Sequence, residues 1–159
     1  GTLRLTAVKT LKGVREVIRH PGAVCVLPIR ENGNVVFVNQ FRYAFNKVTL
    51  EAPAGKLDKG ELPLDAAKRE LREETGLVAG NIVYLGEMYT TPALIDEIIH
   101  LYLATDLTAG EQDLDEDEFI NVIEMRLDAA IEKVMNGEIK DSKTQTILLK
   151  AEKYLQGRK

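Results

Sequence analysis

The feature that most restricts the fold of this chain is a 13-residue segment in which apolar residues recur at helical spacing. The residues at positions i, i+3 and i+7 of this stripe are Leu64, Ala67 and Leu71. Pro63 suits the first position of a helix, and Gly76 suits the position after its end. The segment therefore predicts a helix over Pro63–Thr75 with its apolar face against a core.

The same helix carries a cluster of charged side chains, namely Arg69, Glu70, Glu73 and Glu74. At about 100° per residue, Glu70 and Glu74 nearly align and border the apolar stripe. Like charges four residues apart repel, so the cluster needs a compensating cation. Carboxylate oxygens suit a hard ion such as Mg²⁺ or Mn²⁺, commonly shared with substrate phosphates. The alternative is a solvated face of glutamates and arginines.

Strand patterns lie on both sides of this helix. Runs rich in β-branched residues, separated by turn residues, predict strands over Val14–His20, Ala23–Ile29, Val35–Gln40, Val48–Ala52, Ile82–Tyr89, Ile98–Ala104 and Phe119–Met125. Two more helices are predicted over Leu127–Asn136 and Ser142–Leu155. No repeat or Pro/Gly/Ser-rich linker divides the 159 residues, so we expect a single domain over residues 1–159. Its fold class is a layered α/β or α+β fold with a mixed β-sheet.

Charge and cysteine content exclude several classes of protein. The net charge of −4 gives no basic footprint, so we expect no nucleic-acid partner. Cys25 is the single cysteine and lies in an apolar run, which predicts a buried thiol and a reducing, cytoplasmic location. No apolar stretch approaches the roughly 20 residues of a membrane span, and the N-terminus has no signal-peptide pattern. We therefore expect no membrane partner.

The spacing of the charged cluster is more specific than its composition. Gly55, five residues, Glu61, seven residues and then the run Arg69–Leu77 match the Nudix box at every specified position. The chain therefore resembles a Nudix hydrolase. This resemblance implies the Nudix-type α/β/α sandwich of the family. It also implies Mg²⁺-dependent hydrolysis of a nucleoside diphosphate linked to another group, with Mn²⁺ as the alternative ion.

The resemblance also implies roles for the matching residues. Four groups would bind the metal, namely the carboxylates of Glu70, Glu73 and Glu74 and the carbonyl oxygen of Ala54. Arg69 would orient these carboxylates by ion pairing, and Glu73 would also take part in catalysis. Glu61 would stabilise the loop before the helix, and Gly55 would let the backbone turn closely.

Segments outside the box are similar to the ADP-ribose pyrophosphatase branch of the family: His20–Val24, Gln40–Tyr43, Glu51–Gly55, Thr91–Pro92 and Gly137–Asp141. Pro92 lies 15 residues after Leu77, where this branch carries a proline. The next residue is Ala93, where the branch often has glycine, so the loop that shapes the sugar pocket differs here. The branch is homodimeric and usually exchanges N-terminal strands between subunits. We expect residues 1–13 to be a remnant of that region.

The same resemblance implies substrate contacts at Arg15, Glu16, Arg42, Pro92 and Glu97. Arg42 follows an apolar strand, and its planar guanidinium could clamp a diphosphate. Glu97 matches an acidic residue near the terminal ribose or the metal. Arg15 and Glu16 match a strand that reaches the nucleotide across the dimer, although an ordinary exposed pair fits them equally well.

The acidic segment Gln112–Glu118 would be interpreted as solvated charge in most sequences. In this branch an equivalent loop places a glutamate over the diphosphate as the catalytic base. Glu116 is the preferred candidate and Glu118 the alternative. For His20 and His100 we expect structural or surface roles.

The sequence thus predicts a homodimeric, Mg²⁺-dependent enzyme that hydrolyses ADP-ribose to AMP and ribose 5-phosphate. The alternatives are the same chemistry on a GDP- or UDP-sugar, hydrolysis of nucleoside triphosphates, and a Nudix-fold sensor that binds a nucleotide without cleaving it. Pro92 argues against triphosphates, and the complete glutamate cluster argues against a sensor. The loop Pro92–Glu97 is where we expect different sugars to be discriminated.

Overall fold

The computed structural model describes residues 3–111 and 121–157. In chain order the elements are β1 (Arg4–Thr10), β2 (Gly13–Arg19), β3 (Ala23–Pro28), β4 (Asn34–Arg42), β5 (Lys47–Glu51), β6 (Ala54–Lys56), α1 (Pro63–Thr75), β7 (Leu77–Tyr89), β8 (Ile98–Ala109), β9 (Asn121–Arg126), α2 (Leu127–Met135) and α3 (Ser142–Gln156).

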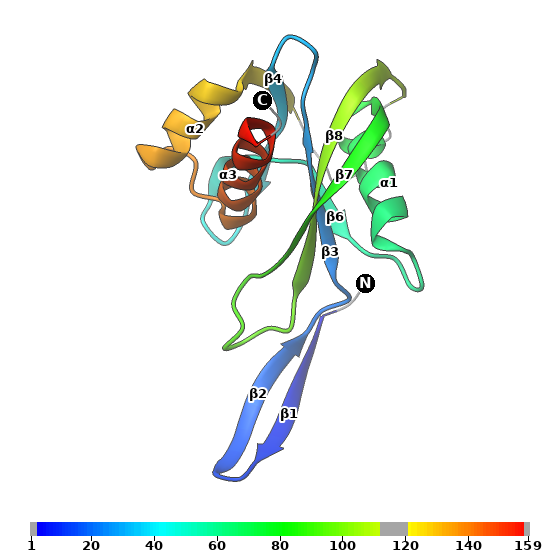
Figure 1. Cartoon of the computed structure of the whole chain (residues 1–159). Coiled ribbons are helices and arrows are strands. Elements are labelled where there is room, and N and C mark those ends of the chain that lie inside the picture. Colours follow the sequence, from blue (N-terminus) through cyan, green and yellow to red (C-terminus); the bar gives the residue numbers. More distant parts are fainter. Residues whose placement is uncertain (1–2, 112–120, 158–159) are drawn as a thin grey trace.

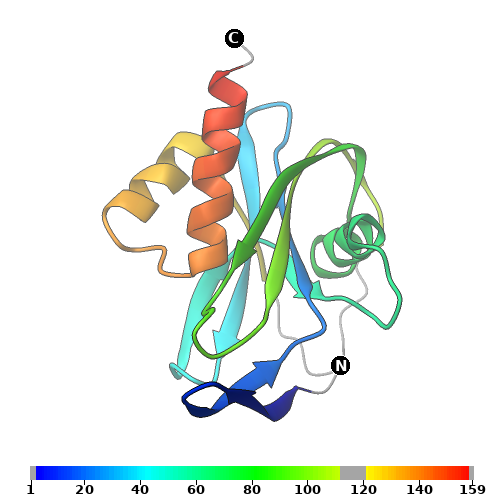
Figure 2. The same cartoon turned by 60° about the horizontal axis from the view of Figure 1, so that its bottom comes forward.

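Two sheets lie between helices (Figures 1 and 2). The larger sheet has the strand order β6-β3-β8-β7, and the smaller has the order β5-β4-β9. Strands β3 and β8 run parallel, whereas the neighbouring pairs are antiparallel, so the larger sheet is mixed. Helix α1 covers one side, and α2 and α3 cover the other. This arrangement confirms the predicted α/β/α sandwich.

Strand β3 separates the two halves of the core. All six of its residues are buried, and the five from Ala23 to Leu27 alternate between the clusters on its two faces. Cys25 and Leu27 pack with residues of α3, whereas Val24 and Val26 pack with Ala67 and other residues of α1. A strand covered on both faces is apolar throughout, which explains the unbroken run in the sequence. Cys25 is fully buried as predicted, and burial raises the pKa of its thiol.

Helix α1 begins and ends where the sequence predicts. Pro63 lies in its first turn, and Gly76 follows it in the left-handed conformation at φ 66°. The Gly76 N–H donates to the Arg72 carbonyl over 2.8 Å and closes the last turn. One detail of the prediction is wrong: Leu64 is 41% exposed, and Ala66 is buried in its place.

The N-terminal residues form an antiparallel hairpin of β1 and β2, which stands away from the sandwich (Figure 1). Strand β1 was not among the predicted strands. The base of the hairpin is held where the Ile18 N–H donates to the Leu94 carbonyl over 2.8 Å. Arg19 also pairs with Asp96 over 2.7 Å. Several apolar side chains of the hairpin face solvent, including Leu5, Leu11 and Val14.

Two strands are longer than their predicted ranges. Strand β7 begins at Leu77 and β8 continues to Ala109, and a bulge between Tyr84 and Gly86 absorbs the irregular register. None of the helices in the described part of the chain is long and apolar enough to cross a membrane.

Candidate active site

One cavity of about 630 Å³ collects residues from both helical layers and from the sheets. A cavity of this size matches small-molecule sites in proteins. Its lining includes Arg69, Glu70 and Glu73 from α1, Ala54 and Gly55 from β6, and Arg42 from β4. The start of α3 adds Asp141, Ser142 and Lys143. The cavity thus has a wall of carboxylates from α1 and a wall that carries two cations.

Arg69 is the centre of the carboxylate wall. Its Nε and Nη2 donate to the two oxygens of Glu61 over 2.8 and 2.9 Å, which is a bidentate pair. Its Nη1 donates to Glu70 over 2.6 Å and to Glu73 over 2.9 Å. The hydrogen bond with Glu61 raises the pKa of Arg69 most, and it lowers the pKa of Glu61. Arg69 therefore supplies positive charge that offsets the repulsion between these glutamates.

The glycine and alanine before α1 are both held against its acids. The Glu70 carboxylate lies where a side chain at Gly55 would be, so the glycine permits a close approach of this carboxylate to β6. The Ala54 N–H donates to Glu74 Oε2 over 3.0 Å. Glu74 is only 3% exposed. Glu70 and Glu74 thus fix the strand β6 to the helix from two sides.

The oxygens of this wall fit a divalent cation by their chemistry. Glu70 and Glu73 share one donor nitrogen of Arg69 and both line the cavity beside the Ala54 backbone. Carboxylate and carbonyl oxygens are the ligands that Mg²⁺ and Mn²⁺ prefer. Within residues 3–111 and 121–157, no three acidic, histidine or cysteine side chains converge as metal ligands do. A divalent cation at this wall would therefore compete with Arg69 for the carboxylate oxygens of Glu70 and Glu73.

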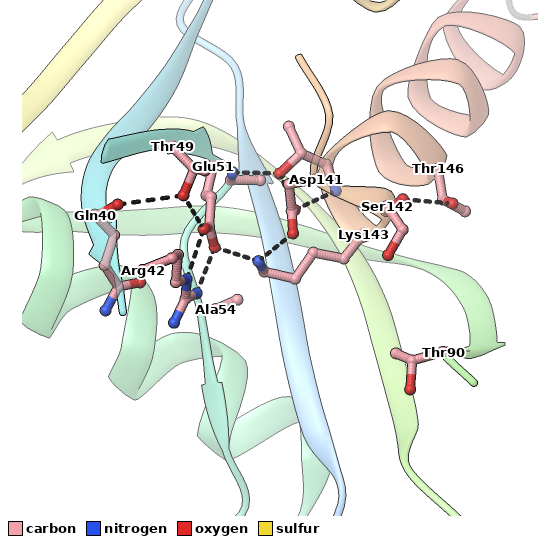
Figure 3. Close-up of polar contacts among 12 residues, drawn as sticks. Gln40, Arg42, Thr49, Glu51, Ala54, Thr90, Asp141, Ser142, Lys143 and Thr146 are labelled. Atoms are coloured by element: carbon pink, nitrogen blue, oxygen red, sulfur yellow. Dashed lines mark hydrogen bonds and ion pairs between the residues drawn. The ribbon is translucent and has the colours of Figure 1, made fainter. Parts of the chain in front are cut away.

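The second wall is built on Glu51, the last residue of β5 (Figure 3). Arg42 donates through Nε over 2.7 Å and through Nη2 over 2.5 Å to the two oxygens of Glu51. The Lys143 ammonium and the Thr49 hydroxyl donate to the same carboxylate. Glu51 is only 2% exposed. Burial opposes its ionisation, but the hydrogen bonds from Arg42 and the charge of Lys143 outweigh it and lower the pKa of Glu51 to about 2.

Lys143 was not predicted as a site residue. It also pairs with Asp141 over 3.0 Å, and Asp141 caps α3 by accepting from the Thr144 N–H over 2.9 Å. Burial lowers the pKa of Lys143, but Asp141 and Glu51 outweigh it and raise that pKa. Lys143 precedes the buried Ile147 by four residues, on the same helix face. That spacing was the available signal of a buried, paired lysine.

A third group lies where β2 leads into β3. His20 Nε2 lies 3.3 Å from Glu97 Oε1, and the Thr90 hydroxyl donates to the other oxygen of Glu97 over 2.8 Å. The Gly22 N–H donates to His20 Nδ1 over 3.1 Å, so the proton of a neutral His20 lies on Nε2. All three side chains, His20, Thr90 and Glu97, line the cavity. His20 is thus positioned to hold the Glu97 carboxylate in place at the cavity.

The structure brings together six of the predicted site residues, which all line the cavity: Arg42, Ala54, Arg69, Glu70, Glu73 and Glu97. Four other predicted residues that the structure describes do not line the cavity. Glu74 is buried beside Ala54 and does not contribute to the lining. Arg15 and Glu16 are exposed on the β2 hairpin, and Pro92 is exposed in the following loop. Glu116 and Glu118 lie outside the described residues.

Comparison with known proteins agrees with this geometry. The NUDIX domain family matches residues 19–145. The chain is 45% identical over 132 residues to the ADP-ribose pyrophosphatase of Bacillus subtilis (strain 168), covering 82% of this chain and 71% of that one. It is 47% identical to the methanol dehydrogenase activator of Bacillus methanolicus, with the same coverage of both chains.

Some more divergent relatives are named for a different substrate. A GDP-mannose pyrophosphatase of Yersinia enterocolitica is 36% identical over 150 residues, which are 87% of this chain and 78% of that one. Among solved structures, an ADP compounds hydrolase superposes with a TM-score of 0.82 over 98% of this chain and 86% of its own. Its sequence is 20% identical, so it supports the fold alone.

Proposed function

This chain belongs to the Nudix family, and from that premise we propose that it hydrolyses the diphosphate bond of ADP-ribose, with Mg²⁺, to AMP and ribose 5-phosphate. The observation that supports this most directly is the pairing of two walls in one cavity. Glu70 and Glu73 offer oxygens to a divalent cation, while Arg42 and Lys143 offer positive charge to phosphates. A diphosphate substrate requires both.

The cation would be held by Glu70, Glu73 and Glu74 with the carbonyl oxygen of Ala54. When bound, it supplies Lewis-acid polarisation of the diphosphate oxygens. Arg69 holds Glu70 and Glu73 close together, because one of its nitrogens hydrogen-bonds to both carboxylates. Mn²⁺ would suit the same oxygen ligands.

The remaining cavity residues have roles in binding. Arg42 presents a planar guanidinium with donors left after its pair with Glu51, and Lys143 presents an ammonium, so both can hydrogen-bond to phosphate oxygens. Glu97 offers carboxylate oxygens to a sugar hydroxyl. The proton of the attacking water would pass to a glutamate of the acidic segment, Glu116 or else Glu118.

We further propose that the enzyme works as a homodimer in the cytoplasm. Arg15 and Glu16 are not among the described residues that line the cavity, and the hairpin that carries them exposes Leu5 and Leu11. Burial of that apolar surface against a second copy would bring the pair toward the partner's nucleotide. Sedimentation at micromolar concentration should give a dimer, and a fully active monomer would contradict this.

A substrate panel tests the proposal. ADP-ribose, GDP-mannose, UDP-sugars, dinucleotides and nucleoside triphosphates would each be incubated with Mg²⁺, with Mn²⁺ and with a chelator. We expect ADP-ribose to give the highest kcat/KM, with AMP and ribose 5-phosphate as products. Hydrolysis in ¹⁸O-labelled water, with mass analysis of both products, would identify the attacked phosphorus. A preference for GDP-mannose would correct the substrate, and binding without hydrolysis would indicate a sensor.

A further inference from the structure

We propose that Glu51 is a positioning residue that sets where Arg42 and Lys143 present their positive charges to the substrate. This inference rests on the proposed function. The Glu51 carboxylate does not line the cavity, but both cations that it binds do. Its effect on substrate would therefore pass through the two cations (Figure 3).

The contacts of Glu51 fix the direction of the Arg42 guanidinium. Arg42 has a side chain that is 40% exposed, and an arginine at such exposure is ordinarily free to change rotamer. Two parallel hydrogen bonds to Glu51, of 2.7 and 2.5 Å, hold it in one plane. They raise the pKa of Arg42 further, so its charge is constant in the working pH range.

The same carboxylate ties together distant parts of the chain. Glu51 ends β5, and Lys143 lies in the first turn of α3, 92 residues later. The Ala52 N–H donates to the Thr144 hydroxyl over 2.9 Å, which joins the backbone after β5 to a side chain of α3 at the same point. With Glu51 removed, the adjacent charges of Arg42 and Lys143 would repel each other. The negative charge between them is what allows two cations to share one wall.

A contribution to stability alone does not account for this arrangement. Buried ion pairs often add little net stability, because desolvation offsets the attraction between the charges. Here Glu51 is almost completely buried, whereas its partner Arg42 remains open to the cavity. If the pair served packing alone, Arg42 would not be expected to point into the cavity.

The expected kinetic signature follows from the charges of the substrate. The diphosphate is already negative before reaction, so Arg42 and Lys143 bind the ground state and the transition state alike. Misplacement of these two cations should therefore raise KM more than it lowers kcat. We expect Glu51→Gln to raise KM for ADP-ribose roughly 10- to 100-fold, as for loss of a charge-assisted contact. Its kcat should fall by less than about 5-fold.

Two further variants separate positioning from folding. Glu51→Asp keeps the charge on a shorter side chain and should recover part of the affinity. Glu124→Gln is the matched control, because it breaks an Arg30–Glu124 pair of 2.7 Å that contributes nothing to the cavity lining. It should leave KM and kcat unchanged. Urea unfolding of each variant gives the folded fraction, to which the kinetic constants are referred.

Calorimetric titration with inorganic pyrophosphate, with and without Mg²⁺, tests the inference independently of turnover. Glu51→Gln should bind pyrophosphate roughly 10-fold more weakly than wild type, and Glu124→Gln should bind it equally well. Unchanged KM and unchanged pyrophosphate affinity in folded Glu51→Gln would overturn the inference, as would a loss of kcat with constant KM. If wild type fails to hydrolyse ADP-ribose, the proposed function fails, yet weakened pyrophosphate binding by the variant would still support the positioning role.

Discussion

The carboxylate of Glu70 occupies the space that a side chain at Gly55 would need. A Cβ built on Gly55 would lie 2.0 Å from Glu70 Oε1 and 2.3 Å from Oε2, far inside van der Waals contact. The glycine of the Nudix box thus leaves room for the Glu70 carboxylate. Because Gly55 has no side chain, the Glu70 carboxylate of α1 can lie against strand β6.

Gly55→Ala should therefore abolish turnover without unfolding the protein. The new methyl group would displace the flexible end of Glu70, which costs little, since the backbone of Gly55 has no positive φ to preserve. Displaced from Arg69 and from the cavity, Glu70 could no longer hold a cation. We expect kcat/KM to fall at least about 100-fold and stability to fall by about 1 kcal/mol.

Gly157→Ala is the control for this substitution. Its Cβ would make ordinary contacts of 3.6 Å, and its φ of −73° suits alanine. Activity should be unchanged, and thermal unfolding of both variants would be compared. An active Gly55→Ala enzyme would argue that the position of Glu70 is unimportant.

Arg69→Ala should make the protein more dependent on Mg²⁺ for stability. The substitution removes the cation that Glu61, Glu70 and Glu73 share, which should cost roughly 2 kcal/mol. A divalent ion bound to the native state then stabilises it by mass action. The rise in melting temperature with Mg²⁺ concentration should thus be larger for the variant than for wild type. An equal rise in both would indicate that the ion binds elsewhere.

Glu74→Gln separates two roles of a buried acid. The amide oxygen of glutamine can still accept the Ala54 N–H, so the strand should stay in place, whereas the negative charge is lost. If Glu74 binds the metal, turnover should fall by about 100-fold or more and the Mg²⁺ concentration for half activity should rise. Near-wild-type turnover at saturating Mg²⁺ would indicate that Glu74 has only a structural role, as the acceptor of the Ala54 N–H.

The ion pairs of Glu51 predict a pH dependence of stability. The pKa of Glu51 is about 2 in the folded protein, below its ordinary value of 4.5. The stabilisation is therefore complete above pH 4.5 and is lost as pH falls toward 2. At about 1.4 kcal/mol per pKa unit, the ionised Glu51 contributes on the order of 3 kcal/mol to the free energy of unfolding. Urea unfolding would give the free energy of unfolding at pH 6 and at pH 3. Between these two pH values, wild type should lose about 2 kcal/mol more of this free energy than Glu51→Gln.

Much of the carboxylate wall could be predicted because it is local. Helix α1 begins at Pro63 and ends before Gly76 as expected, and the spacing within one helix then determines which acids share a face. The strand β3 was predicted for a similar reason. A continuous apolar run depends little on the neighbours that cover it.

Of the cation wall, Arg42 was predicted from the family resemblance, whereas Glu51 and Lys143 were not. The contact between Glu51 and Lys143 joins residues 92 positions apart, and neither lies in a periodic charged pattern. The weak signals were an acid beside buried Ala52 and a lysine on the face of Ile147. Only tertiary packing pairs these two charges. Strand β1 was missed because it pairs solely with β2 and buries little surface.

The acidic segment that follows β8 supplies the candidates for the catalytic base. Of the described carboxylates that line the cavity, Glu70 and Glu73 are bound to Arg69, Asp141 to Lys143, and Glu97 accepts from Thr90, while Asp58 also contributes to the lining. A base must have a carboxylate that can take a proton from water. The segment containing Glu116 and Glu118 is acidic and follows directly in the chain. The resemblance to the ADP-ribose pyrophosphatase branch implies a base on such a loop, so we expect it to come from these two glutamates.

Glu116→Gln should lower kcat by about 100- to 10,000-fold, the usual contribution of a general base, with little change in Mg²⁺ dependence. Glu118→Gln should lower it less, and the opposite ranking would transfer the role to Glu118. Two carboxylates so close in sequence can substitute for one another, so each single variant can be mild while the double variant shows the full loss. The pH profile gives an independent check, because the acidic limb of kcat reports the base and should disappear with it. If the double variant retains both wild-type kcat and the acidic limb, the base is elsewhere, and Glu97 and Glu73 are the next residues to test.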